Sequence, residues 1–153
     1  GASFPELLDG APWPARSRER MLVQLRAAVR IMKIRGGLYG LLGISLHVPT
    51  PQAPCVLLVW DEVHKLFAEQ WDGRAEAIDL AGQLVREGGK FGVAMIAADQ
   101  LPSIETFGGD EALRSNLWSR QVFALRNTSN SASTLIPGLQ VDTKHLPAVW
   151  PDG

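Results

Sequence analysis

The residues with the clearest potential for chemistry are two adjacent carboxylates, Asp61 and Glu62, which follow the apolar run Val56–Trp60. A continuous apolar run of this length predicts a strand buried on both faces, as in a parallel sheet. In open α/β sheets, ligands bind where the chain leaves the carboxyl ends of the strands. An acid pair there predicts a Walker B site, in which Asp61 lies near a magnesium ion held with a nucleotide phosphate and Glu62 orients a water. The alternative is that Asp61 caps the following helix and Glu62 lies solvated in its first turn.

A strand, a helix and a second strand are predicted around this acid pair. Residues 91–98 form another short apolar run, which predicts the second strand. Residues 74–87 carry apolar side chains on one side and polar side chains on the other, which predicts a helix. Gly88 and Gly89 are expected to close that helix as a C-terminal glycine cap. Elements in this order and at this spacing predict a βαβ unit with parallel strands and a right-handed crossover.

Polar residues also follow the second predicted strand, which ends in Asp99 and Gln100. The carboxyl ends of parallel strands meet at the same edge of a sheet. We therefore expect Asp61, Glu62, Asp99 and Gln100 in one neighbourhood. This matching polar end favours the nucleotide-site interpretation over the helix cap.

The remaining segments complete a single α/β domain over residues 15–153, after a Gly- and Pro-rich lead-in loop over residues 1–14. Further predicted elements are a helix over 15–34, a short strand over 44–48, a short helix or turn over 63–71, a helix over 110–118 and a third strand over 120–126. The glycines between 36 and 43 are expected to end the first helix and form a flexible connection. They do not predict a phosphate loop, because no Lys follows any of them.

The first predicted helix carries a basic face opposite its apolar face. Seven basic residues and one acid lie between Ala15 and Arg35, whereas the rest of the chain holds eight basic and fifteen acidic residues. One interpretation is that Arg26, Arg30 and Lys33 contact DNA phosphates or an acidic neighbouring subunit. The other is an ordinary solvated face. No aromatic residue is interleaved with these charges, so base stacking is not indicated.

Composition limits the class of protein. With 153 residues and 46% hydrophobic content, the chain can bury one sizeable core. No apolar stretch reaches the roughly 20 residues that cross a bilayer, and no signal-peptide pattern opens the chain. The single Cys55 fits a reducing compartment and hence a cytoplasmic location, and it is expected to be a small core residue.

Three segments resemble one known family and occur in the expected order. Residues 56–67 resemble the Walker B segment of FtsK/SpoIIIE-type DNA-translocating ATPases, with the closest likeness to actinobacterial plasmid-transfer (TraB-like) members. Residues 86–103 are similar to that family's next helix end and strand, and residues 113–120 to the segment after it. The likeness covers roughly residues 55–142.

This resemblance implies a partial RecA-like P-loop ATPase core, with a mainly parallel sheet flanked by helices. Such a core would assemble as a homo-oligomeric ring and move double-stranded DNA with ATP and Mg²⁺. By position, Asp61 would coordinate the metal, Glu62 would activate the attacking water, and Gln100 would sense the γ-phosphate. Arg120, or alternatively Arg114, would be an arginine finger that reaches a neighbouring subunit's nucleotide. Arg120 could equally be an ordinary charge at a strand edge.

The sequence also departs from the family. Asp99 stands where the family has Thr, and Leu101 where it has Arg. An extra carboxylate near a triphosphate is repulsive unless a metal or an Arg offsets its charge. The chain contains no G-x-x-x-x-G-K-[ST] phosphate loop. We therefore expect these residues to be the later part of a longer motor domain, inactive alone, with any membrane anchor outside them.

Two other functions stay open. Residues 61–64 fit the DExH box of superfamily 2 helicases. However, residues 97–100 depart from the Ser-Ala-Thr strand end of those enzymes, and their later Gln-x-x-Gly-Arg-x-x-Arg signature is missing. The chain could instead be a degenerate ATPase-like scaffold that holds neighbours together, or binds DNA through its basic helix, without hydrolysis.

Overall fold

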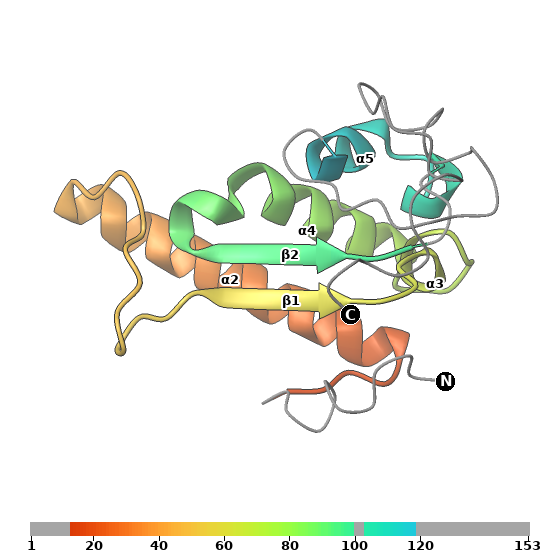
Figure 1. Cartoon of the computed structure of the whole chain (residues 1–153), viewed down its shortest axis with the longest axis horizontal. Coiled ribbons are helices and arrows are strands. Elements are labelled where there is room, and N and C mark those ends of the chain that lie inside the picture. The colour runs from red at the N-terminus through yellow and green to blue at the C-terminus, as the bar shows by residue number, and fades with distance from the viewer. Residues whose placement is uncertain (1–12, 100–102, 119–153) are drawn as a thin grey trace, which may run out of the picture.

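The computed structural model describes residues 13–99 and 103–118 (Figure 1). Its elements in chain order are α2 (Arg18–Leu42), β1 (Val56–Trp60), α3 (His64–Phe67), α4 (Arg74–Glu87), the 3₁₀ helix η1 (Gly88–Phe91), β2 (Val93–Ala97), the 3₁₀ helix η2 (Glu105–Phe107) and α5 (Glu111–Trp118). The predicted third strand over 120–126, and with it Arg120, lies outside the described residues, as does Gln100.

The two described strands form a parallel sheet in which Val56 pairs with Val93 and Trp60 with Ala97. The chain passes from β1 to β2 through α3, α4 and η1, so the predicted βαβ order with parallel pairing is confirmed. The fold is therefore α/β. Each strand is short, with five residues, and both strands end at the same edge of the sheet.

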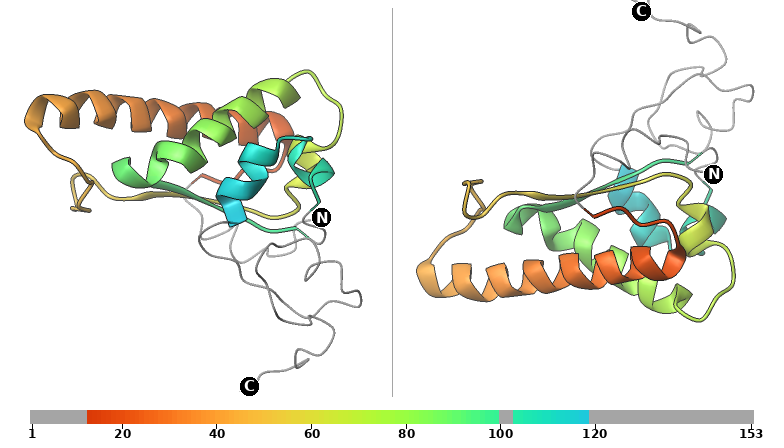
Figure 2. Two further views of the ribbon diagram at one scale, coloured as in Figure 1. Left: turned by 90° about the horizontal axis from the view of Figure 1, so that it is seen from above. Right: turned by 90° about the horizontal axis from the view of Figure 1, so that it is seen from below.

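Helices α2 and α4 cover one face of this sheet (Figure 2). They contribute half of the buried apolar core, and Leu25 of α2 and Ala81 of α4, like Phe67 of α3, have no exposed surface. On the other face of the sheet, Leu57 and Val59 are 54% and 56% exposed. The prediction that the apolar run is buried on both faces is thus wrong for this structure. Alternate residues of a strand point to opposite faces, and the described helices cover only one of them.

Helix α2 runs well past its predicted end at residue 34 and continues through the glycines to Leu42. Packing explains this continuation. A Cβ at Gly36 would lie 3.3 Å from the Phe91 ring, so glycine there allows the helix to approach η1 closely. The helix ends at Gly43, whose positive φ of 66° suits a glycine C-cap. The prediction of a helix stop at the first glycines was therefore wrong.

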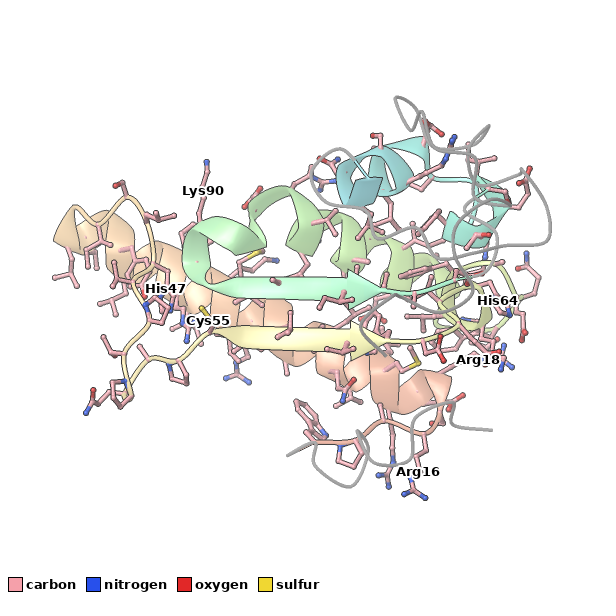
Figure 3. The ribbon with its side chains drawn as sticks, viewed as in Figure 1. Arg16, Arg18, His47, Cys55, His64 and Lys90 are labelled. Atoms are coloured by element: carbon pink, nitrogen blue, oxygen red, sulfur yellow. The ribbon has the colours of Figure 1, made fainter. Side chains whose placement is uncertain are left out.

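The segment after α2 is a loop, so the predicted strand over 44–48 is absent from the structure. The loop is fixed by hydrogen bonds instead. Its His47 N–H donates to the Lys90 carbonyl at 2.8 Å, and the Arg35 guanidinium donates to the carbonyls of Pro54 and Phe91 at 2.7 and 2.8 Å. Cys55, at the end of this loop, is exposed and is not the core residue that its sequence position predicted (Figure 3).

Helix α4 forms over the predicted residues, but its end differs from the prediction. Gly88 has an ordinary helical φ of −54° and starts η1, and Gly92 adopts the left-handed conformation with φ of 67°. Gly88 is needed for space instead, because a Cβ there would lie 2.3 Å from the Val93 carbonyl oxygen.

In the described residues, no helix combines the length and apolar character needed to span a bilayer.

Candidate functional site

The carboxyl ends of β1 and β2, which lie side by side in Figure 1, carry the candidate site. Backbone hydrogen bonds tie the two chain exits together. Ala98 N–H donates to the Trp60 carbonyl at 2.8 Å, and Val63 N–H donates to the Ala98 carbonyl at 3.3 Å. The parallel register therefore brings the acid pair after β1 and Asp99 after β2 to one edge, as the sequence predicts.

Asp61 is exposed at this edge. Its Oδ1 accepts a hydrogen bond from the Glu62 N–H at 3.0 Å, which orients the carboxylate at the mouth of the turn. The N-cap of α3 is Val63, and it has no side-chain cap. The alternative interpretation of Asp61 as the cap of the next helix is therefore not what the structure contains.

Glu62 has a φ of 55°, and in the described residues it is the one non-glycine with positive φ. This left-handed conformation costs on the order of 1 kcal/mol for a residue with a Cβ, and such costs concentrate at functional sites. Its Oε2 accepts an ion-paired hydrogen bond from Lys65 Nζ. That hydrogen bond lowers the pKa of Glu62 below its ordinary value of 4.5 and raises the pKa of Lys65. In this conformation, Glu62 is ionised but directed toward a cation of its own chain.

Asp99 provides the cap that Asp61 does not. Its Oδ2 accepts from the backbone N–H of His64 at 2.9 Å and from the His64 ring Nδ1 at 2.8 Å. The Asp99 side chain is 8% exposed and the His64 side chain 37% exposed. Because a carboxylate only accepts, the contact places a proton on Nδ1. The extra carboxylate that departs from the family pattern is thus engaged by a neighbour on the other strand exit.

His64 is not among the site residues that were predicted from the sequence. The signal was present, since His64 lies three residues after Asp61 and Asp99 ends the neighbouring strand. Only the parallel register shows that these two positions meet across 35 residues of chain.

These residues can satisfy part of the coordination of Mg²⁺. Over residues 13–99 and 103–118, no group of three or more His, Cys, Asp or Glu side chains is arranged to hold a metal ion. Mg²⁺ usually keeps several waters and takes one or two carboxylates together with substrate phosphates. The exposed Asp61 carboxylate fits that requirement as a single protein ligand.

The predicted basic contact face is partly used within the chain. Arg26 makes a bidentate pair with Glu76 at 2.7 and 2.6 Å, and the hydrogen bonds of this pair lower the pKa of Glu76. Arg30 and Lys33 are exposed. Of the three predicted contact residues, Arg26 therefore joins α2 to α4, whereas the other two face solvent.

The alternative arginine finger, Arg114, lies on α5. Its side chain is 16% exposed, and its Nη1 donates to Glu111 at 2.9 Å. The first candidate, Arg120, lies outside the described residues, as does Gln100. The roles of these two residues at the γ-phosphate therefore stay predictions.

Comparisons with protein-family models, with curated proteins and with solved structures found no match.

Proposed function

We propose that this chain supplies the Walker B part of a RecA-like ATPase core that belongs to an ATP-driven double-stranded DNA translocase. The observation that carries the proposal is the shared edge of the parallel strands, where exposed Asp61 and strained Glu62 lie beside Asp99. An edge of this kind is where open α/β sheets bind ligands. Three segments resemble FtsK/SpoIIIE-type ATPases and occur in the same order. This resemblance is the reason that the proposal includes a nucleotide and DNA.

In this proposal, ATP and Mg²⁺ are bound by a longer protein in the cytoplasm, which assembles as a ring. Asp61 would hold the metal, which would neutralise charge on the phosphates. Glu62 accepts the proton of the attacking water, and Gln100 and Arg120 keep their expected roles at the γ-phosphate. Because Glu62 is paired with Lys65, it must leave that partner before it can orient a water. The orientation of water by Glu62 therefore competes with an internal ion pair.

ATP hydrolysis tests the proposal. We expect the longer protein to hydrolyse ATP only with Mg²⁺. Hydrolysis should be faster with double-stranded DNA, because a translocase couples DNA movement to ATP hydrolysis. Residues 1–153 alone should neither hydrolyse ATP nor bind it tightly, because they lack the phosphate loop and its Lys. Robust turnover by the 153-residue chain would contradict the proposal.

The second candidate is a scaffold that holds neighbours together or binds DNA without hydrolysis. It is favoured by one observation: two of the site carboxylates, Glu62 and Asp99, are already paired with Lys65 and His64. A longer protein that binds DNA but shows no Mg²⁺-dependent turnover would support the scaffold over the motor.

A further inference from the structure

The C-terminal end of α2 and the loop after it expose a cluster of apolar side chains, which we call the apolar tip. Its members are Ile34, Leu38, Leu41, Leu42, Ile44, Leu46 and Val48. Their exposed fractions run from 42% for Ile44 to 88% for Leu41. Figures 1 and 2 show this end of α2 projecting beyond α4 and the strands. Exposed apolar side chains that gather at one end of a molecule indicate a contact site.

Hydrogen bonds hold the apolar tip from its inner side. The N–H groups of Gly43 and Ile44 both donate to the Tyr39 carbonyl, the second at 2.9 Å. The Tyr39 hydroxyl bonds to Nδ1 of buried His47 at 2.6 Å, and the His47 N–H donates to the Lys90 carbonyl at 2.8 Å. The fold thus fixes the loop while leaving the apolar side chains outward.

The surface beside the apolar tip is basic. No Asp or Glu occurs between Met21 and Trp60. Arg30 and Lys33, both exposed, precede the tip on α2. Residues four apart lie on the same face of a helix, so Arg30 is in line with Ile34 on the outward side. Positive charge and apolar surface therefore share one face.

This combination discriminates between partners. DNA phosphates would engage the charges but would leave the apolar side chains in water. A second copy of the chain that docked through the same apolar tip would bring Arg30 and Lys33 of the two copies together, and like charges facing each other are unfavourable. An anionic bilayer surface uses both features, because apolar side chains enter the headgroup region while Lys and Arg meet lipid phosphates.

We propose that the apolar tip docks this protein on an anionic membrane surface. Leu38 and Leu41 insert among the headgroups, and Arg30 and Lys33 lie over the lipid phosphates. Interfacial docking needs no spanning helix. The surface is separate from the nucleotide site, since Figure 3 places His47 at one end of the molecule and His64 at the other. The inference therefore does not depend on the proposed ATPase function.

Vesicle co-sedimentation of the 153-residue chain tests this proposal. Vesicles of phosphatidylcholine mixed with phosphatidylglycerol should pellet the protein, and vesicles of phosphatidylcholine alone should pellet far less. Replacing Leu38→Ser and Leu41→Ser should lower partitioning on the order of tenfold for each side chain. Replacing Arg30→Gln and Lys33→Gln should lower binding to the anionic vesicles by roughly fivefold for each charge.

The matched control is Leu57→Ser with Val59→Ser, because these side chains are similarly exposed but lie on the open face of the sheet. After circular dichroism has established that every variant is folded, the control should bind as the unmodified chain does. Absence of binding to anionic vesicles, or an equal loss in the control, would overturn the proposal. The proposal would also be overturned if analytical ultracentrifugation showed a dimer of the unmodified chain and a monomer of the Leu38→Ser, Leu41→Ser variant. That result would assign the apolar tip to contact between copies.

Discussion

Glu62 combines a left-handed backbone conformation with an ion pair to Lys65, which lies three residues later. The pairing is local and depends on the turn that the positive φ creates. Asp99 and His64 form a second pair, and this one joins two strand exits that are far apart in sequence. The candidate site is therefore built from one local and one long-range interaction, and each can be removed separately.

Replacing Lys65→Met should return the pKa of Glu62 toward its ordinary 4.5, because the hydrogen bond from Lys65 is the largest cause of its lowering. A carboxylate with a lowered pKa stabilises the fold above about pH 4.5, and this contribution is lost as pH falls through the lowered value. NMR titration of the Glu62 carboxyl carbon measures the change. Arg26→Met is the reciprocal control, since it should raise the pKa of Glu76 alone. An unchanged Glu62 titration would refute the pairing.

Replacing Asp99→Ala should lower the free energy of unfolding by about 1–3 kcal/mol, because it leaves two donors of His64 without their acceptor. Urea denaturation measures this loss. Asp72→Ala is the control, since Asp72 is exposed and an exposed site typically changes stability by no more than about 0.5 kcal/mol. Equal stability of the two variants would show that the pair contributes nothing to the fold.

The sequence pattern predicted some helices and strands correctly and misplaced the end of α2. The periodicity of α4 identified this helix, because burial on one side repeats with the period of the backbone, and short continuous apolar runs identified β1 and β2. The end of α2 could not be read in the same way. Each glycine costs a helix roughly 1 kcal/mol relative to Ala, but contacts with Phe91 and His47 outweigh that local preference. Those contacts are long-range and leave no periodic signal.

Replacing Gly37→Ala should stabilise the protein by roughly 0.5–1 kcal/mol, because Gly37 lies inside α2 and an added Cβ meets no atom within 4 Å. Gly92→Ala is the matched opposite. It should destabilise the protein, since Gly92 has φ of 67° and its Cβ would lie 2.0 Å from the His47 ring. Thermal unfolding of both variants measures the effects. If Gly37→Ala has no stabilising effect, α2 ends where the sequence predicted and not at Leu42.

At the scale of the whole molecule, the two ends of the short sheet differ in chemistry. One end, where Figure 3 labels His64, gathers the carboxylates of the candidate site. The other end, where Figure 3 labels His47, carries the apolar tip with Arg30 and Lys33 beside it. The position of the candidate site could be predicted from the acid pair after β1 together with the polar end of β2, because strand ends in α/β sheets are ligand-binding positions. The partners of Glu62 and Asp99, and the exposed face of the sheet, could not be predicted, because they depend on which surfaces meet in three dimensions.

In the proposed function, Glu62 activates the water that attacks ATP. The decisive measurement is of ATP turnover and ATP binding, with Glu62→Gln, in the longer protein that this function requires. The variant keeps the shape of the side chain but cannot accept a proton, so turnover should fall on the order of a hundredfold or more while binding is retained. Unchanged turnover in the folded variant would contradict the claim and leave the acid pair without a catalytic role.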